Sequence, residues 1–307
     1  MHTAYLTHPS YLRHDMGPWH PESPARLRAI DDRLHAAHLF DHLLHVEAPA
    51  ATREQLLRVH DAAYVDAIEA AAPAAGLHML DPDTSMGPHT LEAAYHAAGG
   101  AVRAVDLVLG GEAANAFVAC RPPGHHATRN QAMGFCIFNN VAVAAAHALA
   151  AHGLERVAIV DFDVHHGNGT EDIFRDEPRV MLCSTFQHPF YPFRGADTVS
   201  PHIVNVPLPA GTAGSGYREA FSMRIVPRLE AFRPQLVLCS AGFDGHREDE
   251  MAQFGLVEAD YVWITEQVMD VAARHAEGRI VSVLEGGYDL SALGRSVAAH
   301  IKALAAL

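Results

Sequence analysis

Short apolar runs alternate with longer segments of helical periodicity along most of the chain. The runs are nearly continuous in Val, Ile, Leu and Ala, which is typical of strands that are covered on both faces. The runs that we predict to be strands are Ala116–Cys120, Val157–Val160, Val180–Ser184, Ile203–Val206, Leu236–Ser240 and Ile280–Leu284. The segments that we predict to be helices are Asn140–His152, Tyr217–Phe232, Glu258–His275 and Leu290–Leu304.

A capping box predicts a further helix nearer the N-terminus. Thr52 is followed three residues later by Gln55, so we expect a helix that begins after Thr52 and runs to about Ala72. Alternating strands and helices imply right-handed crossovers and a parallel sheet with helices on both faces. The sequence contains no internal repeat, low-complexity tract or linker-like segment. We therefore expect one α/β domain that spans residues 1–307.

Composition narrows the class of protein. Hydrophobic residues make up 49% of the 307 residues, and acidic side chains outnumber basic ones by 36 to 22, for a formal charge of −14. Such a charge argues against a nucleic-acid-binding protein, which needs a basic surface. The four cysteines form no C-x-x-C pair, which favours buried thiols in a reducing compartment. The sequence has neither a secretory signal nor an apolar stretch of membrane-spanning length, so we expect a soluble, cytoplasmic protein.

Four of the predicted strands run directly into dense polar clusters. In chain order the clusters read R-P-P-G-H-H, D-F-D-V-H-H-G-N-G, A-G-F-D-G-H and E-G-G-Y. In an open parallel sheet, ligands bind outside the carboxyl ends of the strands, so the four clusters are expected to converge on one crevice. The chemically active side chains that they contribute are His125, His126, Asp161, Asp163, His165, Asn168, Asp244, Glu285 and Tyr288.

The second cluster has the spacing of metal ligands. Asp161, Asp163 and His165 stand at i, i+2 and i+4, so an extended chain would point them to one side. With Asp244 from another strand end, the set contains carboxylates and an imidazole but no cysteine. Such a set, with positions left open for substrate, suits a catalytic Zn²⁺, Fe²⁺ or Mn²⁺ ion. The alternative is that the aspartates are helix caps and the histidine an ordinary polar group.

Two adjacent histidines supply candidate acid and base groups, because imidazole titrates nearest to neutral pH. Asp161 is placed to fix the tautomer of one ring and to favour its charged form. Asn168 can orient the other ring without adding a charge, which leaves that ring less basic. Tyr288 follows two glycines, and its phenol can donate a hydrogen bond to an oxygen that acquires negative charge. Cys136 has apolar neighbours and is predicted to lie in the core.

Taken together, these motifs resemble a known family. R-P-P-G-H-H-A, G-F-C-I-F-N-N-V, D-F-D-V-H-H-G-N-G-T, S-A-G-F-D and E-G-G-Y are similar, in order and spacing, to the zinc-dependent histone deacetylases and acetylpolyamine amidohydrolases. The resemblance runs from about His20 to Tyr288. It implies the arginase/deacetylase fold, with about eight parallel strands. H-P-E at His20–Glu22 and Asn168, where other branches have Asp, resemble the class II branch and its bacterial relatives.

The resemblance also implies roles for individual residues. Asp163, His165 and Asp244 would be the ligands of one catalytic Zn²⁺. His126 would be the general base and acid, with His125, paired with Asp161, as its electrostatic partner. A metal-activated water would then attack the amide carbonyl, while Tyr288 stabilises the oxyanion.

Further positions follow from the same resemblance. Residues of the substrate channel would be Gly134, Phe135, Tyr191, Met251, Gly286 and Gly287, although the family more often has Phe at the Tyr191 position. Asp249–Met251 also departs from the commoner Asp-Pro-Leu pattern at the channel rim. Arg26 would line an inner cavity. A structural K⁺ would be held, largely through backbone carbonyls, by Asp161, Asp163, His165, Ser184 and Thr185.

The expected function is the removal of acetyl or other short acyl groups from a primary amine, either a lysine in a protein or a polyamine. A polyamine needs carboxylates near the channel mouth, for which the candidates are Asp81, Asp83, Glu248, Asp249 and Glu250, and these are otherwise solvated loop acids. Two other functions remain open. A two-manganese ureohydrolase shares the implied fold but needs a second set of ligands. A catalytically weak member would act as an acyl- or amine-binding sensor or interaction module. The sequence leaves a homo-oligomer open.

Overall fold

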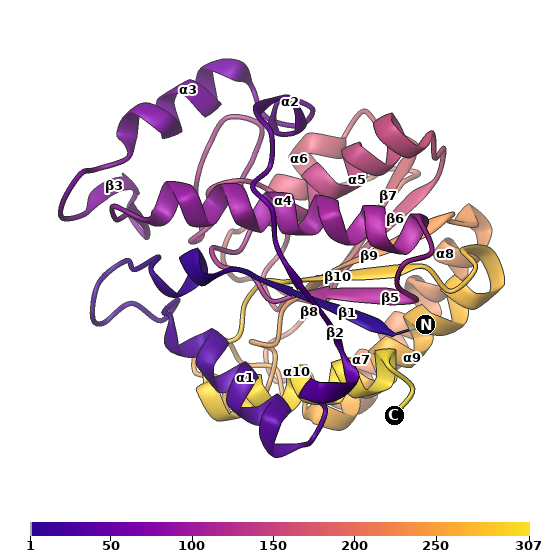
Figure 1. Ribbon diagram of the computed structural model, residues 1–307. Helices are drawn as coiled ribbons and strands as arrows, with labels where there is room; N and C mark the ends of the chain where they lie inside the picture. Colours follow the sequence, from indigo (N-terminus) through magenta and orange to yellow (C-terminus); the bar gives the residue numbers. More distant parts are fainter. Residues whose placement is uncertain (1) are drawn as a thin grey trace.

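Eight strands form one parallel sheet at the centre of the computed structural model, which describes residues 2–307 (Figure 1). The order of the strands is β2-β1-β5-β10-β9-β6-β7-β8. This confirms the predicted α/β architecture with a parallel sheet of about eight strands. The bounds are β1 Thr3–Thr7, β2 Leu44–Glu47, β5 Asn115–Val118, β6 Val157–Asp161, β7 Val180–Gln187, β8 Ile203–Leu208, β9 Leu236–Ala241 and β10 Ile280–Leu284.

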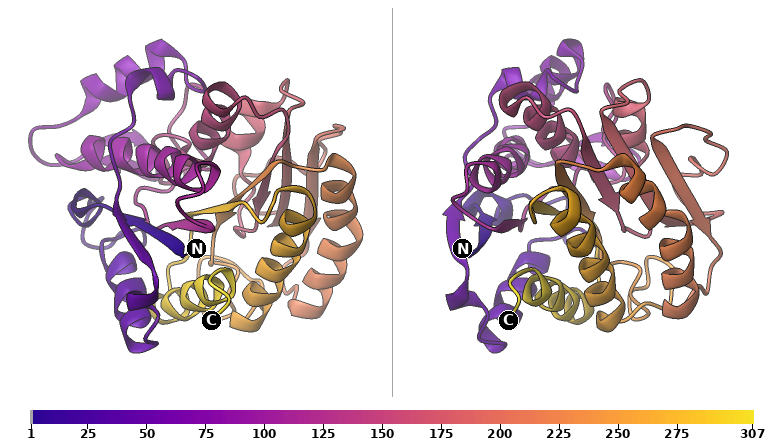
Figure 2. Two further views of the ribbon diagram at one scale, coloured as in Figure 1. Left: turned by 45° about the vertical axis from the view of Figure 1, so that its right-hand side comes forward. Right: turned by 90° about the vertical axis from the view of Figure 1, so that its right-hand side faces the viewer.

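Helices cover both faces of this sheet (Figure 2). One face carries α1 Ala25–Ala36, α7 Gly214–Arg224, α8 Val226–Phe232, α9 Glu258–His275 and α10 Leu290–Leu304. The other face carries α4 Thr90–Leu109, α5 Asn140–His152 and α6 Asn168–Phe174, with the short α2 Arg53–Leu56 against α5. A small antiparallel hairpin, β3 His78–Asp81 and β4 Thr84–Met86, and helix α3 Ala62–Ala71 complete the fold.

The core lies on both sides of the sheet. Every residue of β5, β6, β7, β9 and β10 is buried, as their continuous apolar sequences predict. All four cysteines are free and buried, and Cys136 lies in the core as expected. Within residues 2–307, no helix is both long enough and apolar enough to cross a bilayer.

Two of the predicted helices are interrupted. The segment Tyr217–Phe232 was expected to be one helix but forms α7 and α8, which meet at Ile225. Pro227 is the second residue of α8. A proline has no N–H to donate to the preceding turn, and its ring clashes with the carbonyl four residues earlier. The predicted single helix is therefore wrong at this point.

The N-terminal capping box is confirmed, but the helix that it starts is short. Thr52 accepts from the backbone N–H of Gln55, and the Gln55 side chain accepts from that of Thr52. Helix α2 then ends at Leu56, so the prediction of a helix to about Ala72 is wrong. His60 lies in the segment between α2 and α3. Its ring contacts the carbonyl of Thr128 at 2.9 Å and the backbone N–H of Asn139 at 3.0 Å.

Candidate active site

The four polar clusters lie side by side because the strands that carry them are neighbours. The middle of the sheet has the order β5-β10-β9-β6, and these strands are all parallel. Their carboxyl ends therefore form one edge, which faces left in Figure 1. The structure thus brings together the chemically active residues that the sequence placed at four separate strand ends.

Asp163, His165 and Asp244 form what we call the strand-end cluster. The Nδ1 atom of His165 lies 3.1 Å from Oδ1 of Asp163 and 3.1 Å from Oδ2 of Asp244. One potential ligand atom from each of the three residues lies within 4.8 Å of the other two. All three side chains are buried. They are therefore close enough to contact one common ion.

The charges around this cluster favour a cation. Asp161, Asp163 and Asp244 are buried together, and such an excess of negative charge is costly without a positive partner. Burial lowers the pKa of His165, but its hydrogen bonds to Asp163 and Asp244 outweigh burial and raise the pKa to about 10. The position between the three side chains therefore attracts positive charge, which a divalent cation can supply.

Two glycines leave room for the two carboxylates. A β carbon on Gly242 would collide with the carboxylate of Asp163, and one on Gly286 would collide with that of Asp244. The backbone N–H of Gly286 donates to Oδ2 of Asp163 at 2.8 Å. The residues present thus fit a metal ion with oxygen and nitrogen ligands.

His125 is held in its charged form. Its Nδ1 donates to Oδ2 of Asp161 at 2.9 Å, as the sequence predicted for this pair. Burial lowers the pKa of His125, but the carboxylates of Asp161, Asp163 and Glu285 outweigh burial and raise the pKa well above its ordinary value. This ring is therefore an imidazolium that balances part of the buried negative charge.

His126 has the opposite environment. Its Nδ1 donates to Oδ1 of Asn168, the first residue of α6, at 2.7 Å. Burial and the nearby rings of His125 and His165 keep the pKa of His126 well below its ordinary value. With the Nδ1 proton fixed by Asn168, Nε2 of a neutral His126 carries a free lone pair. Two adjacent histidines are thus held in different protonation states.

The role of Glu285 was not predicted from the sequence. Its carboxylate accepts from the backbone N–H groups of Gly124 at 2.7 Å and of His125 at 3.1 Å, and from Ser240 at 3.2 Å. Burial raises the pKa of Glu285 to about 7. Glu285 therefore fixes the loop that carries both histidines. Its position at the end of β10, directly before two glycines, was the only signal.

Tyr288 is fixed from two sides. Its backbone N–H donates to Oδ2 of Asp249 at 2.6 Å, and the guanidinium carbon of Arg26 lies 5.1 Å from the centre of its ring. Arg26 is fully buried and donates to the carbonyls of Gly287 and Glu285. Burial and the charge of Asp244 raise the pKa of Tyr288 well above its ordinary value, so the phenol remains protonated.

A channel leads to the strand-end cluster. It is a cavity of about 300 Å³ lined by Asp83, His126, Gly134, Phe135, His165, Phe190, Tyr191, Met251 and Tyr288. The predicted wall residues Gly134, Phe135, Tyr191 and Met251 are among them. Phe190, which the sequence analysis missed, stacks on His165 with ring centres 5.5 Å apart. Its place next to Tyr191 was the available signal.

Two expectations about the channel need correction. Gly286 and Gly287 are not among the residues that line it. Gly286 lies behind the carboxylates of the strand-end cluster, and the carbonyl of Gly287 accepts from Arg26. Asp249 is not a solvated acid of the mouth, because it is 5% exposed and holds the backbone of Met251 and Tyr288.

Apart from Asp81, the other candidate mouth acids line the channel or a hollow that shares Met251 and Tyr288 with it. Only Asp83 lines the channel, whereas Glu248 pairs with Arg295 at 2.7 Å. Glu250 lines a neighbouring hollow. Asp81 contacts the backbone N–H of Asp83 at 3.3 Å but does not line the channel.

The residues expected to hold a monovalent cation lie on two paired strands, β6 and β7, and in the loop that follows β6. Asp161 of β6 is directly opposite Ser184 of β7, and Thr185 follows. Within residues 2–307 the buried hydroxyl of Ser184 has no hydrogen-bond partner. An oxygen without a partner beside buried carboxylates fits a cation site.

A second group of potential ligands, which we call the helix cluster, joins α4 to α5. The Nε2 atoms of His147 and His152 both lie 2.8 Å from Oδ1 of Asp106. Arg58 donates to Nδ1 of His147 at 2.9 Å. Because a guanidinium cannot accept a hydrogen bond, Nδ1 of His147 must be the acceptor. A neutral His147 therefore carries its proton on Nε2, directed at Asp106, where it blocks metal binding. We interpret this group as a hydrogen-bonded network.

Comparison with known proteins agrees with the geometry. A family model described as histone deacetylase domain matches residues 20–304. A histone deacetylase-like amidohydrolase of Pseudomonas aeruginosa is 42% identical over 276 residues, which cover 88% of this chain and 72% of that protein. A polyamine deacetylase of Mus musculus is 38% identical over 300 residues, which cover 92% of this chain and 44% of that protein. The crystal structure of the HDA15 HD domain matches with a TM-score of 0.93 and 36% identity, covering 99% of this chain and 90% of that one. The chain belongs to the histone deacetylase family.

Proposed function

We propose that this protein is a zinc-dependent deacetylase that removes acetyl or other short acyl groups from primary amines. The observation that carries the proposal is the strand-end cluster at the floor of a narrow channel, beside one charged and one neutral histidine. Asp163, His165 and Asp244 would hold one Zn²⁺. A divalent ion there supplies polarisation of the acyl carbonyl and lowers the pKa of water.

His126 would move the proton. Its unprotonated Nε2 can take a proton from the attacking water and then give it to the leaving amine. Asn168 keeps the other ring nitrogen protonated, so that the ring presents the correct atom. His125 stays charged beside Asp161 and lowers the basicity of His126, which favours the return of the proton to the amine.

Tyr288 would stabilise the tetrahedral oxyanion. Its phenol is kept protonated by burial, so it can donate a hydrogen bond to the oxygen that becomes negatively charged. Asp249 and Arg26 fix its backbone and ring, so little reorganisation is needed when the charge develops.

The channel suits an acyl group on a slender chain. Phe135, Phe190 and Met251 give it mainly apolar walls, and the carboxylate of Asp83 is the acidic group in its lining apart from the floor. Such a channel accepts an acetylated lysine side chain of a protein and equally an acetylpolyamine, whose second cation would meet Asp83. Steady-state kinetics on an acetyl-lysine peptide, acetylputrescine and acetylspermidine will rank these substrates.

A K⁺ ion bound by Asp161, Asp163, His165, Ser184 and Thr185 is a further part of the proposal. The buried hydroxyl of Ser184 supports it. We expect the melting temperature to be higher in KCl than in the same concentration of LiCl. Equal values in the two salts would contradict a specific site.

Two measurements test the main proposal. We expect one zinc per chain, and turnover of a fluorogenic acetyl-lysine substrate that a hydroxamate chelator abolishes. A pair of manganese ions would instead indicate a ureohydrolase. One zinc per chain with no turnover of any of these acylated amines, but with measurable binding, would indicate a sensor.

A further inference from the structure

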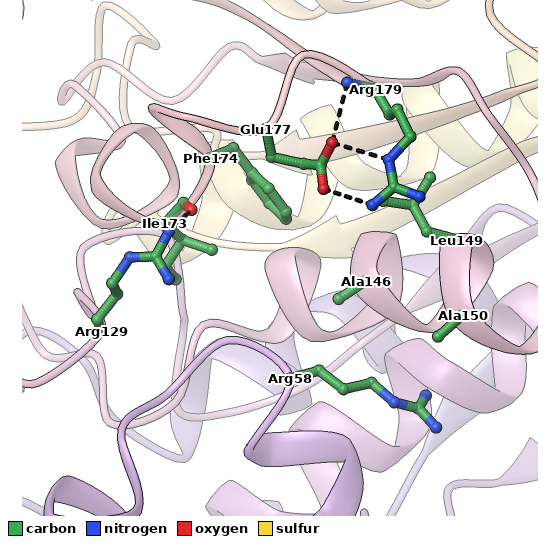
Figure 3. A pocket seen from close by; sticks show the side chains of 9 residues that line it. All are labelled: Arg58, Arg129, Ala146, Leu149, Ala150, Ile173, Phe174, Glu177 and Arg179. Carbon is green, nitrogen blue, oxygen red and sulfur yellow. Dashed lines mark hydrogen bonds and ion pairs between the residues drawn. The ribbon is translucent and has the colours of Figure 1, made fainter.

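A separate hollow lies between α5 and the segment that follows α6, away from the channel. It has a volume of about 470 Å³ and shares no lining residue with the channel. Figure 3 shows arginines around it, with α5 along one side. The lining residues are Arg58, Arg129, Ala146, Leu149, Ala150, Ile173, Phe174, Glu177 and Arg179.

The lining carries an excess of positive charge. It contains three arginines and a single carboxylate, Glu177, which Arg179 occupies with hydrogen bonds of 2.8 and 2.5 Å. Among residues 2–307, Arg129 has no carboxylate within ion-pair distance of its guanidinium, which donates to the carbonyl of Ile173. Arg58 lies on the other side of the hollow, where it donates to Glu54, whose side chain is 83% exposed, and to Nδ1 of His147. A local positive site in a chain of net charge −14 favours an anion.

The rest of the lining is apolar. Ala146, Leu149 and Ala150 project from successive turns of α5, and Phe174 faces them across the hollow (Figure 3). The volume is that of a small-molecule site, for which an apolar lining with a few oriented polar groups is usual. Guanidinium groups bind carboxylate and phosphate oxygens in pairs, which gives such a site direction as well as charge.

The hollow also adjoins the segments that hold the catalytic base. Arg129 stands three residues after His126, and its backbone N–H donates to Oδ2 of Asp172 at 3.2 Å. Ile173 and Phe174 end the helix α6, which begins with Asn168, the partner of His126. A molecule bound in the hollow would therefore contact both the loop that carries His126 and Arg129 and the end of α6.

We propose that this hollow is a binding site for a small organic anion, in which a carboxylate or phosphate group lies against Arg129 and an apolar body lies on α5. The proposal concerns a different cavity from the function proposed above, and its test uses that function only through the hydroxamate that keeps anions out of the channel.

Phenyl phosphate is a suitable probe, because it combines an anionic group with an apolar ring. Inorganic phosphate tests the anionic group alone, and phenol tests the ring alone. Binding is measured by titration calorimetry on the zinc-loaded protein with a saturating hydroxamate in the channel, so that anions cannot reach the zinc. We expect phenyl phosphate to bind one per chain, and more tightly than either of the other two. No binding, or binding only when the hydroxamate is left out, would overturn the proposal.

Variants locate the site. Arg129→Gln should weaken phenyl phosphate binding by about tenfold, because it removes a charged hydrogen-bond donor. Glu177→Gln releases Arg179 and should tighten binding. Arg274→Gln is the matched control, because this exposed arginine pairs with Glu230 on another face. An unchanged melting temperature shows that each variant is folded. Equal affinity in Arg129→Gln and the control, or weaker binding in Glu177→Gln, would place the anion elsewhere.

Discussion

Two carboxylate–imidazole groups in this protein have nearly the same spacing but different chemistry. In the strand-end cluster of Asp163, His165 and Asp244, the imidazole nitrogen lies 3.1 Å from each carboxylate oxygen. In the helix cluster of Asp106, His147 and His152, both imidazole nitrogens lie 2.8 Å from one carboxylate oxygen. Donor types and distances alone would therefore assign a metal ion to both.

Charge and burial separate the two clusters. The strand-end cluster combines two buried carboxylates with one imidazole, and Asp161 is a third carboxylate buried beside it. In the helix cluster, the single carboxylate is partly exposed and is shared by two histidines, and Arg58 fixes the ring proton of His147 on the wrong nitrogen for a metal. An unbalanced, buried negative charge is thus the feature that distinguishes a metal site from a hydrogen-bonded network.

The strongest test of this contrast removes one carboxylate from each cluster. Asp244→Ala should lose the metal and reduce turnover to the background of the assay, because two ligands remain in a buried site. Asp106→Asn should keep one zinc per chain and normal turnover. Metal content by plasma emission spectrometry and kinetics on the acetyl-lysine substrate check both. Normal metal content in Asp244→Ala would mean that the strand-end cluster is not the zinc site.

His126 sharpens the contrast, because it lies beside the strand-end cluster without belonging to it. His126→Ala should retain one zinc per chain while kcat falls by about 10²- to 10⁴-fold, the usual range for a general acid–base residue. The neutral state of His126 predicts that the acid limb of kcat/KM lies below its ordinary pKa of about 6.5. Loss of zinc in His126→Ala would show that this residue is a ligand instead.

Tyr288→Phe should have a somewhat smaller effect. Removing one oxyanion donor costs on the order of 10²- to 10³-fold in kcat, while the zinc content and the folded state stay unchanged. Tyr64→Phe is a matched control, because it also removes a buried phenol that donates, in this case to the carbonyl of Ile137 at 2.6 Å, outside the channel. Turnover of Tyr288→Phe close to that of the control would contradict the proposed role.

The sequence predicted the fold best where an element has a continuous apolar run or a regular helical periodicity. Helices α5, α9 and α10 have the predicted bounds, and β10 does as well. The edge strand β2 was missed because it is short and largely exposed, so its sequence has no continuous apolar run. Helix α4 was not predicted, and it contains Gly99 and Gly100, a residue type that is unfavourable inside a helix. In the structure Gly99 sits against the backbone of Pro49 and Ala51, where no β carbon fits.

The residues of the site also differ in how well the sequence predicted their positions. Residues directly at strand ends, such as Asp163 and Tyr288, could be placed from the sequence because parallel strands share one carboxyl edge. The contacts of Asp249 and Glu285 could not, because they depend on how loops distant along the chain fold over one another. Asp249 reads as a loop acid in the sequence, yet it accepts from backbone N–H groups about 40 positions away.

The smallest expected effect is in the helix cluster. His152→Ala should keep one zinc per chain and turnover within about twofold of the wild type. It should lower the free energy of unfolding by less than about 1 kcal/mol at pH 7, because partly exposed pairs contribute little. His42→Ala, which removes an exposed histidine outside the cluster, is the control.

The pH dependence of this small effect tests its origin. Burial raises the pKa of Asp106, but the hydrogen bonds from His152 and His147 outweigh burial and lower it. A lowered pKa stabilises the fold above the ordinary aspartate pKa of about 4, and this stabilisation is lost as the pH falls through the lowered value. The difference between wild type and His152→Ala in the free energy of unfolding, measured with urea, should therefore shrink as the pH drops below about 4.

A zinc titration tests the contrast itself. If the wild type binds a second zinc ion that His152→Ala does not bind, the helix cluster is a metal site, and unbalanced charge is not what distinguishes the two clusters.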